Sequence, residues 1–353
     1  MSTNVQGRSH ILRAAIVAAL AAAALSQVPV RKAQAACTDT INGVITCTGD
    51  LSGGVNASQD ADPNDFNDKT TTVLRVENVT TSIAPTPGVT GVRIEERRPF
   101  ARDGDPQMQN VTVNLTGTAG QPLTISTRPS LLFPAAAVSL VTITGEASDG
   151  ADATSGFLCA GSDSAEVGQN GLTGNRLTAD VSNVNITTLN GVGIKLQNAA
   201  GIGGYGGAGN ACHGSEAGGL GGGGAVATLT LTNSTIRTAG AGASAITVSS
   251  AGGKGGHGGD GGAFRYGSRG GVGGDGGTVN ITGSATLETN GVQALGIHAV
   301  SIGGDGGDGG DSSAFGGGGD GPLGAGGGTV RVDGTFDIHT HGAESAGIGA
   351  YSI

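Results

Sequence analysis

Aromatic and charged residues are both scarce in this chain. Of its 353 residues only 3% are aromatic, none is tryptophan, and 13% are charged. That inventory is poor material for the core of an ordinary α/β enzyme or for a surface that binds nucleic acid. The net charge is -10 at pH 7. Because a polyanionic chain repels phosphate groups, we expect neither nucleic acid nor an anionic lipid surface as a general partner.

Common catalytic motifs are also missing. The sequence contains no G-x-S-x-G elbow, no P-loop and no H-E-x-x-H pattern. Ser162 and Ser164 flank Asp163, but nothing in the sequence selects a histidine partner for them. We therefore predict a non-enzymatic protein with no catalytic residues and no cofactor.

Long apolar runs are absent after the N-terminus, where one short run stands. Arg8 precedes an almost wholly apolar segment, Ile11–Leu25, and a small-x-small exit follows at Ala33–Ala35. These are the three parts of a secretory signal peptide. The run is shorter than the roughly 20 residues that cross a membrane as a helix. We predict a signal peptide at 1–35, cleavage after Ala35 or Ala36, no transmembrane helix, and export to the periplasm, the cell surface or the medium.

The four cysteines follow the predicted cleavage point, as expected of disulfides in an oxidising compartment. Cys37 with Cys47 would staple a hairpin, and Cys159 with Cys212 would close a long loop. Cys37 would also stand near the new N-terminus, where lipoproteins carry their lipid. Gln34, rather than a Leu-like residue, stands three positions before it, which favours the disulfide.

Glycine is abundant, with 71 residues, and it separates copies of a repeat. Segments 279–302 and 330–353 align without a gap at an offset of 330 minus 279, or 51. Within a copy, apolar and polar residues alternate, which is typical of β-strands. Copies with one apolar edge per strand must stack to bury it. The sequence therefore predicts an all-β, right-handed parallel β-helix (solenoid) with long Gly-rich inserts between its coils.

This fold fixes a register and three regions. Residues 1–35 are the signal peptide, 36–180 an N-terminal cap with irregular coils, and 181–353 the repeats, with inserts at 201–224, 252–277 and 303–328. Two inward ladders are predicted: Ile236, Leu287 and Ile338, and Ile246, Ile297 and Ile348. The predicted outward ladder is Arg237, Glu288 and His339, which avoids like-charge contacts.

The inserts allow two interpretations. Their GGX triplets are compatible with a flexible linker, or with three-residue-per-turn polyproline II helices that pack through their glycine faces. In the second case Lys254, His257 and Asp260 lie along one edge, and Asp305, Asp308 and Asp311 along another. The three aspartates are weak candidates for calcium, because half of a calcium-binding nonapeptide recurs here without its large apolar residue.

One strand carries a further weak metal candidate. Asp337, His339 and His341 share a strand face and could hold zinc or nickel. Two imidazoles at i and i+2 on an exposed strand are more typical of a solvated face. We therefore predict no metal site there.

Two motifs resemble a known family. They are ITCTGDLSGGV at Ile45–Val55 and GIxAxSIGGxGGxGG at Gly296–Gly310. With the signal peptide, they are similar to the N-terminal part of glycine-rich autotransporter passengers of proteobacteria, over most of the chain. The resemblance implies a β-helical passenger carried out by a C-terminal outer-membrane barrel. No series of amphipathic strands with aromatic girdles follows the repeats, so we expect a fragment or a truncated reading frame.

The predicted function is an adhesin-like, exported surface solenoid. Its expected partners are the export machinery and a glycan or protein on a host or neighbouring cell. One alternative is a β-helical polysaccharide lyase or hydrolase, for which Arg237, Glu288 and Asp337 are the loose candidates. Another is a Gly-rich structural or ice- or ion-interacting module dominated by its inserts.

Overall fold

The described residues form an all-β structure. The computed structural model describes residues 36–39, 43–57, 73–97, 100–101, 110–130, 135–154, 163–262, 265–312 and 317–353. All belong to one compact unit, Ala35–Ile353, and they contain strands and no α-helix. None of them lies in a helix long and apolar enough to cross a membrane. The predicted signal peptide lies outside these residues.

Most of the described strands have two to seven residues, and three have 11 to 13. In chain order they are β1 (Ala36–Asp39), β2 (Val44–Gly49), β3 (Val55–Asn56), β4 (Val73–Val79), β5 (Val92–Arg97), β6 (Phe100–Ala101), β7 (Val111–Thr116), β8 (Leu123–Thr127), β9 (Val138–Ile143), β10 (Glu146–Ala147), β11 (Leu177–Ser182), β12 (Val184–Leu189), β13 (Ile194–Ala199), β14 (Ala227–Ala239), β15 (Ile246–Ala251), β16 (Val279–Asn290), β17 (Ile297–Ile302), β18 (Val330–Thr340) and β19 (Ile348–Ser352).

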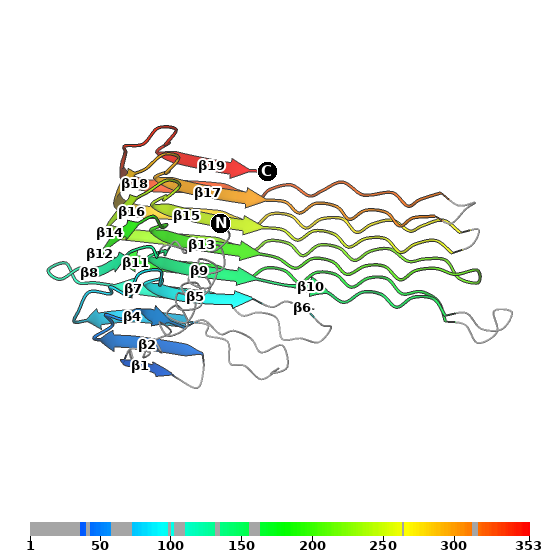
Figure 1. The fold of residues 1–353 in the computed structure, drawn as a ribbon, viewed down its shortest axis with the longest axis horizontal. Coiled ribbons are helices and arrows are strands. Elements are labelled where there is room, and N and C mark those ends of the chain that lie inside the picture. Colours follow the sequence, from blue (N-terminus) through cyan, green and yellow to red (C-terminus); the bar gives the residue numbers. More distant parts are fainter. Residues whose placement is uncertain are drawn as a thin grey trace, which may run out of the picture. The chain divides into compact units, whose positions relative to one another are not determined.

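Most of these strands belong to two large sheets whose pairing is almost wholly parallel. One has ten strands, ordered β1-β2-β4-β7-β11-β14-β12-β8, with β16 on β14 and β18 on β16. The other has seven, ordered β19-β17-β15-β13-β9-β5-β3, and β10 and β6 form a third, small sheet. Figure 1 shows successive repeats side by side in chain order. β4, β7, β8 and β9, within the region predicted as cap and irregular coils, belong to these same two sheets.

The register of the predicted inward ladders is confirmed residue by residue, but Ile348 is 48% exposed rather than inward, because it lies on β19, the edge strand of its sheet. Ile236 pairs with Leu287 and Leu287 with Ile338, while the second ladder pairs Ile297 with both of its predicted neighbours, Ile246 and Ile348. Ile236 and Leu287 are 0% exposed. A one-residue slip would turn the core side chains outward, so the alternation itself holds this register.

A sharp corner divides the larger sheet. Asn183 separates β11 from β12 with φ 52°, and Asn233 takes the same place inside β14 with φ 46°. In the next two repeats the residue with positive φ is a glycine, Gly283 (φ 114°), which pairs with Leu231, and Gly334 (φ 155°), which pairs with Gly283. This backbone region suits glycine and, among other residues, asparagine. Each of these four repeats therefore has, at this corner, one residue that tolerates positive φ.

The N-terminal end of the stack is closed by an antiparallel pair. β1 pairs antiparallel with β2 and sets Cys37 opposite Cys47, whose sulfur atoms are bonded. The predicted hairpin disulfide is confirmed. Cys212 is also disulfide-bonded, but its predicted partner, Cys159, lies outside the described residues.

Candidate interaction surface

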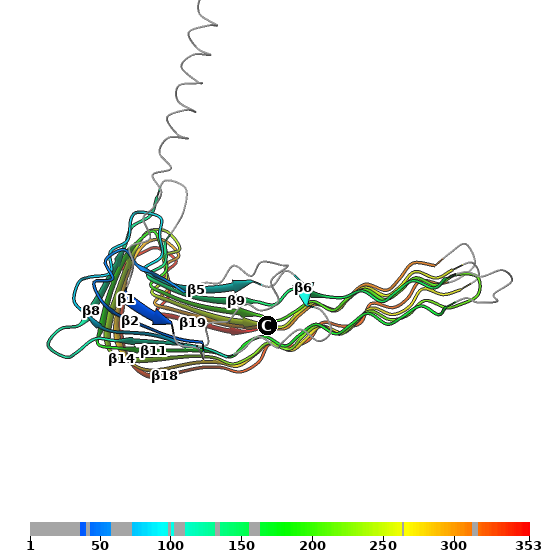
Figure 2. The same cartoon turned by 90° about the horizontal axis from the view of Figure 1, so that it is seen from below.

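The glycine-rich inserts form one continuous structure, which we call the glycine arm. Its outgoing segments are 147–154, 201–210, 252–262 and 303–312, and its returning segments are 163–176, 215–226, 265–278 and 317–329. Figures 1 and 2 show these segments running side by side away from the strands, in two layers. Each segment hydrogen-bonds both to the opposite layer and to the same segment of a neighbouring repeat.

Backbone hydrogen bonds between the two layers form zigzag columns that run from one repeat to the next. The N–H of Gly219 donates to the carbonyl of Gly204, Gly256 to Gly219, Gly271 to Gly256 and Gly307 to Gly271, each at 2.8 Å. A second such column begins at Gly201, three residues earlier. Three residues is one turn of a polyproline II helix. The two layers of the arm are thus hydrogen-bonded to each other once per helical turn.

A second set of bonds joins like segments of neighbouring repeats. Gly203 N–H donates to the Lys254 carbonyl at 2.9 Å, and Gly255 N–H donates to that of Asp305 at 2.9 Å. The first glycine of each triplet therefore bonds to the next repeat, and the second glycine bonds to the opposite layer. The third residue, X, is left on the outer surface.

Aspartate and asparagine at position X complete the hydrogen bonding. Asp260 Oδ1 accepts the N–H of Asp311, the X residue of the next repeat, at 2.8 Å. Asp149 Oδ1 likewise accepts the N–H of Tyr205, and Asn170 Oδ1 accepts the N–H of Leu220, both at 2.8 Å. Since X otherwise turns its N–H toward solvent, these side chains act as backbone acceptors. This role was not predicted from the sequence, although Asp recurring at one triplet position was a signal for it.

Glycine is needed in the arm because of space. A Cβ built on Gly256 would lie 1.9 Å from the Gly204 carbonyl oxygen, and one on Gly253 would lie 1.8 Å from that of Gly201. Neither glycine has φ in the left-handed region, so conformational freedom does not explain the choice. The flexible-linker interpretation is wrong for the described inserts, and packing through glycine faces is confirmed.

The arm begins one repeat earlier than the predicted inserts. Segments 147–154 and 163–176, within the region assigned to the cap and irregular coils, bond to the next repeat: Gly150 donates to Tyr205 and Gly171 to Leu220. This part is less rich in glycine. The spacing of Gly168, Gly171 and Gly174 was the available signal.

The calcium candidates do not converge. Asp305, Asp308 and Asp311 lie one turn apart on one outgoing segment, and a turn advances about 9 Å, whereas calcium ligands lie about 2.3–2.6 Å from the ion. Among the described residues there is no group of three or more His, Cys, Asp or Glu that could hold a metal ion. Asp308 instead lies 3.2 Å from His257 Nδ1 and 4.0 Å from Lys254 Nζ, and the Tyr205 ring packs edge-on against His257 at 4.8 Å.

The predicted outward ladder on the sheet is confirmed. Arg237 pairs with Glu288, and Glu288 with His339. Arg237 Nε donates to Glu288 Oε2 at 3.0 Å, and this bond, with a second from Asn290, holds the pKa of Glu288 below its ordinary value of 4.5. These side chains are open to solvent, where an ion pair contributes little to stability.

Two other candidate groups are partly brought together. His339 Nε2 lies 3.1 Å from Asp337 Oδ1 and its ring stacks on His341 at 6.5 Å. Ser164 Oγ lies 3.4 Å from His213 Nδ1, a partner that the sequence could not select. The neighbouring Asp163 binds Thr154 through its N–H at 2.8 Å. Ser162 lies outside the described residues.

The chain was compared with known proteins in three ways. No family model, no curated protein and no solved structure matches it.

Proposed function

We propose that this chain is an exported, non-enzymatic display protein, the adhesin-like passenger region of an autotransporter. In this proposal the two parallel sheets are walls of a right-handed parallel β-helix, and the glycine arm carries the contact surface. The hydrogen-bonded glycine lattice is the observation that carries the proposal. A lattice without a side-chain core adds ordered surface at each repeat while leaving position X free to vary.

The returning layer supplies the candidate contact residues. Leu220, Val272 and Leu323 stand at position X and are 49%, 41% and 87% exposed. Gly221 N–H donates to the Val272 carbonyl at 2.9 Å, which sets Leu220 beside Val272. Exposed apolar side chains grouped in this way are typical of interaction surfaces. We propose a protein or glycan on a neighbouring or host cell as the partner.

A matched pair of triple variants tests the proposal. The arm variant is Leu220→Ser, Val272→Ser and Leu323→Ser. The control, Val89→Ser, Leu189→Ser and Val292→Ser, removes side chains of similar exposure (40%, 46% and 50%) away from the arm. In a binding assay of labelled protein on host or producer cells, we expect the arm variant to lose binding and the control to keep it. Equal binding by both variants, or loss in the control alone, would overturn the proposal.

The export part has its own test. Expression of the full chain in a Gram-negative host should yield a mature protein whose N-terminus follows Ala35 or Ala36, read by mass spectrometry. An uncut N-terminus in the cytoplasm would contradict export, whatever the binding assay shows.

A further inference from the structure

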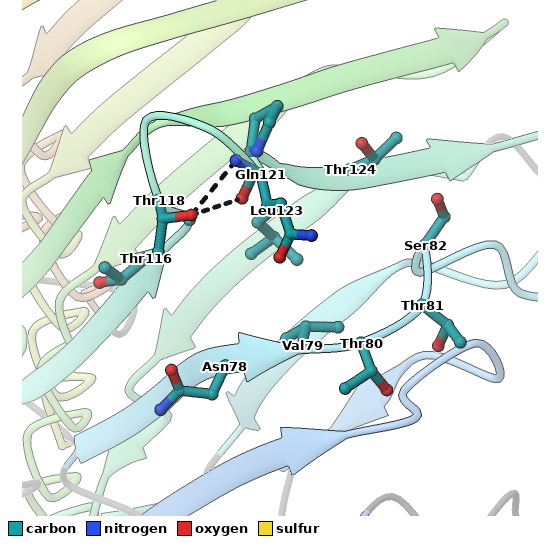
Figure 3. Close-up of a pocket in the computed structure, with 12 residues that line it drawn as sticks. Asn78, Val79, Thr80, Thr81, Ser82, Thr116, Thr118, Gln121, Leu123 and Thr124 are labelled. Atoms are coloured by element: carbon teal, nitrogen blue, oxygen red, sulfur yellow. Dashed lines mark hydrogen bonds between the residues drawn. The ribbon is translucent and has the colours of Figure 1, made fainter.

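A polar hollow lies on the sheet, away from the glycine arm. It has a volume of about 610 Å³ and is formed by residues 78–82, at and after the end of β4, together with 116–118 and 121–124, around the turn from β7 to β8. Figure 3 shows the two groups of side chains at this site. The volume is in the range of about 300–1,000 Å³ in which small molecules bind.

The hollow lies where one corner differs from those of the later repeats. Where the next repeat turns at a single residue, Asn183, the repeat of β7 and β8 has six residues, Gly117–Pro122. Thr118 and Gln121 close this loop by exchanging backbone N–H···O bonds of 3.0 and 3.1 Å. The space between this loop and residues 78–82 is the hollow.

The lining is uncharged but rich in hydrogen-bonding groups. Within the described part of the chain, six polar side chains at the hollow make no hydrogen bond to protein: Asn78, Thr80, Ser82, Thr116, Gln121 and Thr124. Hydroxyl and amide groups both donate and accept. Val79, Pro122 and Leu123 add a small apolar surface between them. Asp50 reaches the rim, where it accepts a 2.6 Å hydrogen bond from Thr81.

We infer that this hollow binds a neutral oligosaccharide. A sugar offers many hydroxyls that both donate and accept, as the lining does, and a C–H face that suits the apolar strip. A phosphate or sulfate ligand would call for a cationic side chain, and a metal ion for carboxylates, neither of which lines the hollow. This inference goes beyond the proposed function, because the hollow lies on the sheet and its residues are not those of the arm.

The experiment uses the full chain and four trisaccharides. Cellotriose, maltotriose and triacetylchitotriose are the neutral probes, with sialyllactose as the charged comparison, and binding is measured by saturation-transfer NMR and calorimetry. The test variant is Thr80→Val with Thr116→Val, which removes two hydroxyls at constant shape. The control is Thr187→Val, an exposed threonine on β12 outside the hollow.

We expect at least one neutral trisaccharide to bind and the double variant to weaken it about tenfold, since each lost hydrogen bond is worth about 0.5–1.5 kcal/mol. The control should bind as the wild type does. No binding by any neutral probe, a preference for sialyllactose, or equal weakening by the control would overturn the inference. Cell binding by the arm is measured with other variants, so the two proposals can fail separately.

Discussion

The sheets and the glycine arm stack at the same interval but are held together differently. In the sheets, Leu287 lies fully buried between Ile236 and Ile338, so apolar burial adds to the backbone bonds. In the arm, Gly256 meets its neighbours through backbone atoms alone. The sheets should therefore lose stability when a core side chain is made smaller, and the arm should lose stability when any side chain is added at such a glycine. The difference shows that glycine can be a packing residue.

The largest effect is expected in the sheets. Leu287→Ala should lower the free energy of unfolding by about 2–5 kcal/mol, because it leaves a cavity in place of a side chain that is 0% exposed. Urea unfolding followed by circular dichroism measures it. Thr286→Ala, the neighbour on the opposite face of β16, is the control and should change stability much less. Equal losses would mean that Leu287 is not a core residue.

A smaller, local effect is expected in the arm. Gly256→Ala places a Cβ 1.9 Å from the Gly204 carbonyl oxygen, so the two segments must separate, at a cost of about 1–3 kcal/mol. Hydrogen exchange should speed up at 201–210 and 252–262 and stay unchanged in β16 and β17. Lys254→Ala, at position X of the same segment, is the control. If both variants leave exchange unchanged, the arm does not depend on glycine contacts.

The sheet register could be predicted from sequence, and the order of the arm could not. Side chains that repeat at a fixed offset, such as Ile246, Ile297 and Ile348, report where strands pair, because each must find an apolar neighbour. A glycine triplet has no side chain that could indicate a pairing partner in this way. It is compatible with a free linker and with a packed helix, and the choice depends on neighbouring segments that supply carbonyl acceptors.

The polar hollow could not be predicted from the sequence, for a different reason. Its two sides, 78–82 and 116–124, come from repeats that show no alignment to each other. The hollow depends on the extra residues of one corner, and a longer corner is visible only once the strands on either side are placed. Single residues such as Gln121 therefore gave no functional signal.

The acceptor role of aspartate at position X should have a smaller effect than glycine packing. Asp260→Ala removes the acceptor of the Asp311 N–H and should destabilise the arm by at most about 1 kcal/mol, seen as faster exchange at Asp311. Asp260→Asn keeps an acceptor oxygen and should restore most of the protection. If Asn behaves as Ala does, the negative charge rather than the hydrogen bond is what matters there.

The smallest effect is expected on the outer face of the sheet, at the pair of Arg237 and Glu288. Since the hydrogen bond from Arg237 lowers the pKa of Glu288 in the folded protein, ionised Glu288 favours folding above its unfolded pKa, near 4.5. That contribution is lost as the pH falls through the lower, folded pKa. Glu288→Gln should therefore slightly lower the midpoint of urea unfolding at pH 7, and should not lower it at a pH below the folded pKa of Glu288. A double cycle with Arg237→Gln should give a coupling that added salt weakens; a coupling unchanged by pH and salt would mean that the ladder is held by strand pairing alone.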